Sequence, residues 1–240
     1  MAKAYHKRYI QGFPNLQKLQ ETLDTPHQLA LSGMDEEVHS RMKWLGMSEH
    51  DEYKKYKVEH ETLRDIRARF QGEIYNSIIH VVTFDLFAST DFSHLYAATR
   101  EPYCNEFLHR LKSVSDGFAY LDREIDMRAL RENLHEDVRG AWFRELEIAD
   151  VNSAALWGPT VTDSDDWARY EALGNISTLS IELDFAVRRE TIQVTRSGGI
   201  VLYGNMDEGE ALEFVQKIDR LVQAHELRTD DPRQPVLPPK

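Results

Sequence analysis

The sequence is poor in cysteine and proline and has no long apolar run. Its one cysteine, Cys104, excludes an internal disulfide and is typical of a reducing compartment, so we expect a cytoplasmic protein. No stretch has the roughly 18 apolar residues that span a bilayer, so we expect no membrane association. Half of the eight prolines fall in residues 228–240, and we expect this Pro-rich tail to be disordered.

Positive charge is also scarce. The chain has 29 Lys and Arg against 41 Asp and Glu, a formal net charge of −12. An acidic surface repels the phosphate backbone, so nucleic-acid binding is disfavoured. Residues 1–70, however, have 12 basic against 11 acidic residues. A nucleic-acid-associated transcriptional regulator that uses this near-neutral third therefore remains an alternative.

Motifs of catalysis and nucleotide binding are missing. The sequence has no Gly-x-x-x-x-Gly-Lys-Ser/Thr loop, no Gly-x-Gly-x-x-Gly after a strand and no Gly-x-Ser-x-Gly elbow. The segment Val81–Phe87 resembles the nucleophile strand of haloacid-dehalogenase-type hydrolases, in which an apolar strand presents an aspartate, here Asp85. The second aspartate of that family is replaced by Phe87. A buried helix is the interpretation we prefer for this segment.

The C-terminal half has clear strand patterns. Leu179, Ile181 and Leu183 alternate with polar residues, and the alternation predicts a half-buried antiparallel strand. Two further strands, turning at Ser197–Gly199, and a helix complete the stretch 175–227. Strands are also expected over Ala141–Ile148 and Val151–Trp157, followed by a short helix that Asp163 or Ser164 caps and Gly174 ends.

The N-terminal half has helical spacing. Helices are expected over residues 14–23 and 32–46, from Pro102 to Val114 and over 118–135. Apolar and aromatic residues from Tyr53 to Ile74 recur every three or four positions, which predicts a long helix that runs on to Phe87 with a bend at Gly72. We see no internal repeat.

The predicted fold class is therefore α+β. A helical region (residues 1–117) precedes a five-stranded antiparallel sheet flanked by helices (118–227). The element order of the second region is similar to that of roadblock, longin and profilin-like modules, and a half of the TATA-box-binding protein is the alternative. The first resemblance implies a protein-binding module, often dimeric, that regulates or scaffolds partners.

Three Glu-x-x-His pairs are candidate metal ligands, because both side chains of such a pair share one face of a helix, as in di-iron bundles. The pairs are Glu36/His39, Glu106/His109 and Glu132/His135. Glu59, Glu73 and Asp85 could supply bridging carboxylates. In a chain this rich in Glu and His such pairs also arise by chance, so no cofactor is expected and a divalent metal is the alternative.

Trp142, Phe143 and Trp157 lie in the first two predicted strands and cannot all face one core. They are the candidate interface residues. Our leading hypothesis is a non-catalytic regulatory or adaptor protein that acts through protein–protein contacts or self-association. A metal-dependent enzyme or sensor is the alternative hypothesis from a different class.

Overall fold

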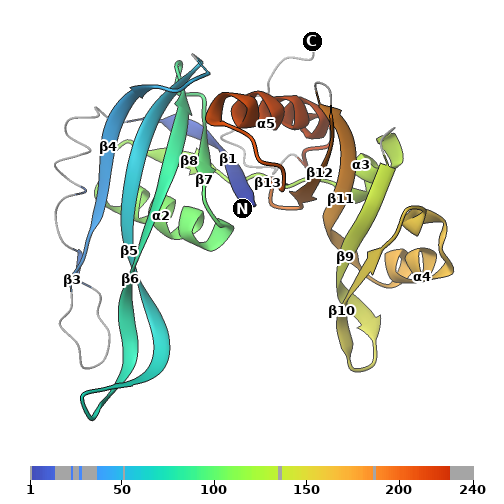
Figure 1. The fold of residues 1–240 in the computed structure, drawn as a ribbon, viewed down its shortest axis with the longest axis horizontal. Coiled ribbons are helices and arrows are strands. Elements are labelled where there is room, and N and C mark those ends of the chain that lie inside the picture. Colours follow the sequence, from blue (N-terminus) through green and yellow to red (C-terminus); the bar gives the residue numbers. More distant parts are fainter. Residues whose placement is uncertain are drawn as a thin grey trace. The chain divides into compact units, whose positions relative to one another are not determined.

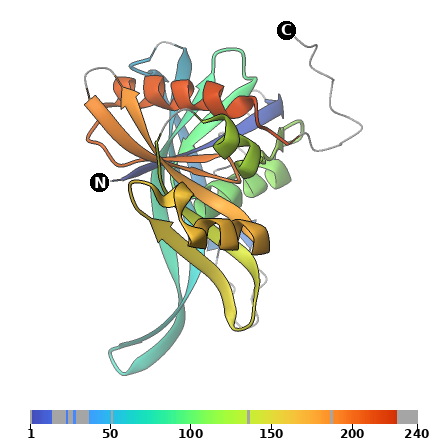
Figure 2. The same ribbon diagram turned by 90° about the vertical axis from the view of Figure 1, so that its right-hand side faces the viewer.

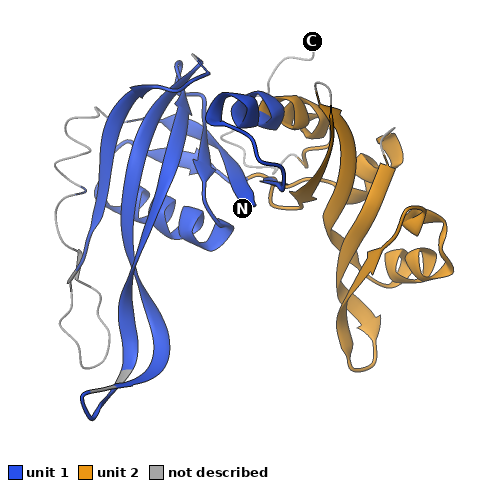
Figure 3. Cartoon of the chain, viewed as in Figure 1, with its two compact units in different colours: residues 1–122, 199–215 blue, residues 123–198, 216–240 orange. Residues whose placement is uncertain are grey.

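The structure is a computed structural model that describes residues 2–13, 23, 27–28, 37–50, 52–134, 137–185 and 188–227. Strands dominate it, with 53% strand against 26% helix. Tertiary contacts divide the chain into two compact units (Figure 3). Unit 1 comprises residues 1–122 and 199–215, and unit 2 comprises residues 123–198 and 216–240.

Unit 1 is built on an antiparallel sheet with the strand order β13-β1-β7-β6-β5-β4, and β8 also pairs with β1 (Figure 1). Its strands are β1 (Lys3–Gly12), β4 (Ser40–Met47), β5 (Tyr53–Phe70), β6 (Glu73–Ser89), β7 (His94–Ala98), β8 (Ala119–Leu121) and β13 (Gly199–Leu202). The two-residue strands β2 (His27–Gln28) and β3 (Glu37–Val38) pair separately. Helix α2 (Glu101–Val114) begins with a proline in its first turn, as the sequence predicts.

The core of unit 1 lies between α2 and one face of the sheet. Phe107 and Leu108 of α2 are fully buried against residues of β5 and β6 such as Tyr56 and Leu86. Phe84 meets Phe107 edge to face, with ring centroids 5.6 Å apart. Burial of one such aromatic or aliphatic side chain contributes about 1.5–3 kcal/mol, so this layer fixes α2 on the sheet.

Unit 2 contains a four-stranded antiparallel sheet in the order β10-β9-β11-β12 (Figure 2). Its elements are α3 (Met127–Asn133), β9 (Asp137–Ile148), β10 (Val151–Trp157), α4 (Asp165–Leu173), β11 (Asn175–Phe185) and β12 (Arg188–Thr195). The register places Leu179 opposite Val194 and Ile181 opposite Ile192, so the alternating apolar residues share one buried face. Helix α5 (Glu208–Gln223) has residues in both units.

The chain passes twice through the same order of elements. Four strands, β4 to β7, precede α2, and four strands, β9, β11, β12 and β13, precede α5. Strand β10 and helix α4 are inserted in the second passage between β9 and β11. The hairpins β5–β6 and β11–β12 therefore occupy equivalent places in the two passages.

The predicted fold class is wrong. Residues 37–98 form strands rather than a helical region, and the described chain is mostly antiparallel sheet, so neither the five-stranded module flanked by helices nor the TATA-binding-protein half describes it. The long helix predicted from Tyr53 to Phe87 is the hairpin β5–β6. Its predicted bend, Gly72, is part of a two-residue turn in which Gln71 and Gly72 have φ of 50° and 94°. Positive φ at both residues matches the twist of a tight hairpin.

Of the other predicted helices and strands, some are confirmed, one is wrong and some lie outside the described residues. The strands at 141–148 and 151–157, the helix capped by Ser164 and the elements of 175–227 are confirmed, whereas the helix over 118–135 is replaced by β8 and the short α3. The tail 228–240 and most of the helix predicted over 14–23 lie outside the described residues. The division at residues 117 and 227 stays a prediction.

Candidate interaction surfaces

The hairpin β5–β6 extends well beyond its neighbours in the unit 1 sheet (Figure 1). Its strands have 18 and 17 residues, whereas β4 pairs with β5 only between residues 54 and 60 and β7 pairs with β6 only between 85 and 88. We call residues 62–82 the arm. In the described part of the chain, no third strand pairs with either edge of the arm.

Large apolar side chains of the arm are exposed to solvent. Their exposed fractions are 59% for Ile74, 42% for Ile78, 37% for Ile79 and 50% for Val81. The register places Leu63 opposite Ile79 and Glu61 opposite Val81, so Leu63, Ile79 and Val81 share one face. Ile74 and Ile78 lie on the opposite face of the ribbon, so exposed apolar side chains on both faces make the arm a candidate contact surface.

The root of the arm rests on α2. Thr62 Oγ1 donates a hydrogen bond of 2.5 Å to Glu106 Oε2, and a nitrogen of the Arg64 guanidinium lies 3.8 Å from Glu106 Oε1. The guanidinium of Arg64 also stacks over Tyr103, 4.7 Å from the ring centroid. These contacts hold the base of the arm in place and leave its outer part, beyond Arg64, as a two-stranded ribbon.

A group of three side chains beside the base of the arm resembles a hydrolase triad. It consists of Ser40, His60 and Glu106. Ser40 Oγ lies 2.7 Å from His60 Nδ1, and His60 Nε2 lies 3.8 Å from Glu106 Oε2. Burial lowers the pKa of His60 to about 4, so the imidazole is neutral. Ser40 is 0% exposed, and a hydroxyl without exposed surface has no access to a substrate. The cluster links β4, β5 and α2.

The four Glu-x-x-His residues that the structure describes do not converge. Glu106 is engaged with Thr62 and Arg64, while His109 and Glu132 are exposed on α2 and α3 and His39 lies between β3 and β4. Glu36 and His135 lie outside the described residues. Among the residues that the structure describes, no three His, Cys, Asp or Glu side chains are grouped so that they could hold a metal ion.

Asp85 also differs from the dehalogenase pattern. It lies in the antiparallel strand β6, which continues to Ser89, and Lys57 Nζ is 2.9 Å from its Oδ1 while Lys55 Nζ is 3.7 Å from its Oδ2. Lys55 also pairs with Glu208. A carboxylate shared by two lysines within an antiparallel sheet is an ion-pair centre, whereas the dehalogenase pattern needs an aspartate that a strand presents as a nucleophile.

The three candidate interface residues of unit 2 have different environments. Phe143 is fully buried and packs edge to face on Trp167, with ring centroids 5.3 Å apart. Trp142 is half-buried, whereas Trp157 is 54% exposed; their rings are perpendicular, with centroids 4.8 Å apart. Trp157 also covers Gly140, where a Cβ would lie within 2.6 Å of its ring.

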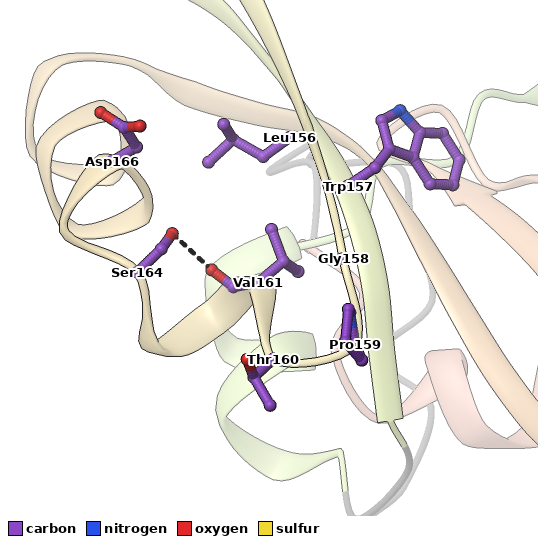
Figure 4. A pocket seen from close by; sticks show the side chains of 8 residues that line it. All are labelled: Leu156, Trp157, Gly158, Pro159, Thr160, Val161, Ser164 and Asp166. Atoms are coloured by element: carbon purple, nitrogen blue, oxygen red, sulfur yellow. Dashed lines mark hydrogen bonds between the residues drawn. The ribbon is translucent and has the colours of Figure 1, made fainter.

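An open pocket of about 290 Å³ lies beside Trp157, between β10 and the start of α4 (Figure 4). Leu156 and Val161 contribute apolar walls, and Ser164 and Asp166 contribute polar groups. Ser164 Oγ donates to Val161 O at 2.7 Å and accepts from Trp167 N at 3.2 Å, so it is occupied in capping α4. The lining of the pocket provides one carboxylate, that of Asp166, and no assembled catalytic group.

The polar residues that alternate with the apolar ones in β11 and β12 form a face that is only partly open. Ser180 is fully buried, Glu182, Gln193 and Thr195 are half-buried, and Asp184 is exposed. Glu182 is paired with Arg139, whose Nε lies 2.7 Å from its Oε2. The alternation in the sequence separates the polar face from the apolar face, but it does not show how far other parts of the chain cover the polar face.

The arm is the feature that the sequence interpretation missed. Its signal is the apolar group Ile74, Ile78, Ile79 and Val81 that follows the Gln71–Gly72 turn, which the sequence analysis assigns to a buried helix. No helix in the described part of the chain combines the length and apolar composition that crossing a membrane requires. Neither a protein-family model nor a curated protein matches this chain.

Proposed function

We propose that this protein is a non-catalytic regulatory or adaptor protein that works through protein–protein contacts, with the arm as its principal contact surface. The observation that supports the proposal is the exposure of four large apolar side chains, Ile74, Ile78, Ile79 and Val81, on a ribbon outside the core. Water around these side chains is released when a partner covers them, which contributes about 25 cal/mol per Å² of apolar surface.

Unit 2 offers a second contact surface. Trp157 is exposed beside the pocket at the end of β10, and tryptophan is among the residues that contribute most to binding at protein interfaces. Its ring is held by Trp142 and Gly140, so little side-chain freedom is lost when a partner covers it. Two surfaces of this kind on one chain suit an adaptor.

The arm can be tested by affinity capture from the native cell with quantitative mass spectrometry. The arm variant carries Ile79→Lys and Val81→Lys, which place charge on the shared apolar face. The control carries Leu227→Lys, which alters an exposed leucine outside the arm. We expect the arm variant to capture at least about tenfold less of each specific partner than the wild type does, and the control to capture wild-type amounts. Equal capture by both variants would contradict the proposal.

A cytoplasmic location belongs to the same proposal. The only cysteine, Cys104, is fully buried in the core of unit 1, and burial raises the pKa of its thiol to about 12. Such a thiol is unreactive and serves packing, which agrees with a protein that needs no disulfide. Fluorescence microscopy of the tagged protein in its native cell tests the location.

A further inference from the structure

The arm has two properties that a partner must match. It presents apolar side chains, and it carries Arg64, Arg67 and Arg69 against two acidic residues, in a chain whose net charge is −12. Arg67 and Arg69 are exposed, beyond the contacts of Arg64 with α2. The fitting partner is therefore an acidic surface with exposed apolar groups of its own.

Unit 2 has such a surface along β10. Residues 144–171 contain seven acidic residues against two arginines. Six of the acidic residues are exposed: Glu145, Glu147, Asp150, Asp163, Asp165 and Asp166. They flank β10 at both of its ends, and β10 itself exposes Val151 and Trp157. We call residues 144–171 the acidic side of unit 2.

Both surfaces also present an open strand edge. Strand β10 is the outermost strand of the unit 2 sheet, and β6 has no partner but β5 between residues 73 and 84 in the described part of the chain. An unpaired edge exposes backbone N–H and C=O groups that another strand can satisfy. Residues 73–81 and 151–157 have comparable lengths, roughly 30 Å and 23 Å at about 3.3 Å per residue.

We infer that the arm of one copy docks along β10 and the acidic side of unit 2 in a second copy of this chain. This inference rests on the proposed function and names the partner of the arm. The β6 edge adds to β10, Ile79 and Val81 meet the exposed apolar groups of β10, and the arginines face the carboxylates. Contact between two arms brings arginines of like charge together and is disfavoured. The contact is heterologous, because the two copies contribute different surfaces.

The first test measures the mass of the full chain by analytical ultracentrifugation over a range of concentrations at low and high salt. We expect a mass that rises with concentration and a dissociation constant that rises at least tenfold between about 50 and 500 mM salt. The double variant Arg67→Glu/Arg69→Glu should weaken self-association by at least tenfold, and Glu147→Lys/Asp166→Lys should do the same. Mixing the two reversed variants should restore association with each other.

The second test locates the contact. Cys104 is buried, so an added surface cysteine is the only reactive one in each variant. Asn76→Cys in the arm and Ser153→Cys in β10 both alter exposed residues. When the two variants are mixed with a short bis-maleimide, cross-links between the different variants should exceed those between identical ones. The variants are expected to keep the wild-type circular dichroism spectrum, which controls for misfolding.

Several results would overturn the inference. These are a monomer at every concentration, cross-links mainly between two arms, or charge-reversed variants that do not rescue one another. A salt-sensitive shift of duplex DNA or RNA that Arg67→Glu/Arg69→Glu abolishes, without self-association, would assign the arm to nucleic acid instead. A monomer whose arm still captures another protein refutes this inference alone, whereas a monomer without arm-dependent capture refutes the proposed function as well.

Discussion

The hairpins β5–β6 and β11–β12 hold equivalent places in the two passages of the chain but have different surroundings. In β11–β12 the apolar residues, such as Ile181 and Ile192, all point to one buried face. In β5–β6 the surroundings change along the strands. Near Tyr53 and Tyr56 both faces are covered, near Val58 and His60 one face is covered by α2, and beyond Arg64 the ribbon is exposed.

This difference explains why one hairpin was recognisable and the other was not. A strand shows a period of two in its sequence where one face carries apolar residues and the other carries polar residues along its whole length. Tyr53 and Tyr56 lie on opposite faces of β5, and both are buried. Their spacing of three residues therefore resembles that of apolar residues on one face of a helix. Further along, the buried positions are taken by His60 and Thr62, which are polar and hide the alternation.

The largest expected contrast is between core and arm residues of the same type. Ile181→Ala in β11 removes a fully buried side chain and should lower the free energy of unfolding by about 2–5 kcal/mol. Ile74→Ala in the arm should change it by less than about 0.5 kcal/mol, because the side chain is 59% exposed. Urea denaturation measures both values. Similar losses for both variants would mean that the arm is packed as part of a core.

Acid should act on unit 1, where two buried histidines lie. Burial lowers the pKa values of His6 and His60 from 6.5 to about 4. The unfolded chain therefore binds protons below pH 6.5 that the folded chain does not bind until about pH 4. Stability is fully present above pH 6.5 and falls as the pH drops toward 4, by about 3 kcal/mol per histidine. The charged groups around them are Glu101 and Arg8 for His6, and Glu106, Arg110, Glu61 and Arg64 for His60.

Unfolding at a series of pH values measures this effect. His60→Gln keeps an acceptor for the Ser40 hydroxyl and removes the titrating ring, so its stability should depend less steeply on pH between 4 and 6.5. His109→Gln, on the exposed side of α2, is the control and should leave the slope unchanged. A wild-type stability that stays flat from pH 7 to 4 contradicts the burial of both histidines.

Two turn glycines give a smaller contrast. Gly198 has φ of 76°, and a Cβ there would lie 2.5 Å from Arg123 Cδ. The fully buried Arg123 pairs with Asp219 and Glu226. Gly198→Ala should therefore cost about 2 kcal/mol or more, from backbone strain and displacement of Arg123. Gly72→Ala at the arm turn has φ of 94° but open space, so only the strain remains, about 1 kcal/mol. Thermal unfolding ranks the two variants, and the reverse order counts against the packing of Gly198.

The smallest expected effect concerns local opening and requires no substitution. A two-stranded ribbon without a covered face is only marginally stable, so amides of residues 66–78 should exchange with deuterium at least about tenfold faster than those of β11. Hydrogen exchange with mass spectrometry measures this at a concentration below self-association. Raising the concentration should slow exchange in the arm if copies associate through it, while β11 stays unchanged as the internal reference.

The sequence by itself determined the elements whose environment is uniform along their length. These are the helix that begins near Pro102, the capped helix before Gly174, and the strands and helix of residues 175–227. Local signals suffice there, because capping residues, turn glycines and one-sided burial act within a few positions. The position of the Gln71–Gly72 turn was likewise visible in the sequence, although its nature was not.

Only the tertiary structure decided the rest. One such feature is the long hairpin of residues 53–89. The elements β4, β7 and α2 cover different parts of it, and the residue pattern of the hairpin itself does not show where this cover lies. The tertiary structure also decided that Phe143 is buried while Trp157 is exposed, and that the described members of the Glu-x-x-His pairs form no metal-binding group. Burial depends on which segments distant in sequence come together. A periodicity within one segment cannot specify its neighbours.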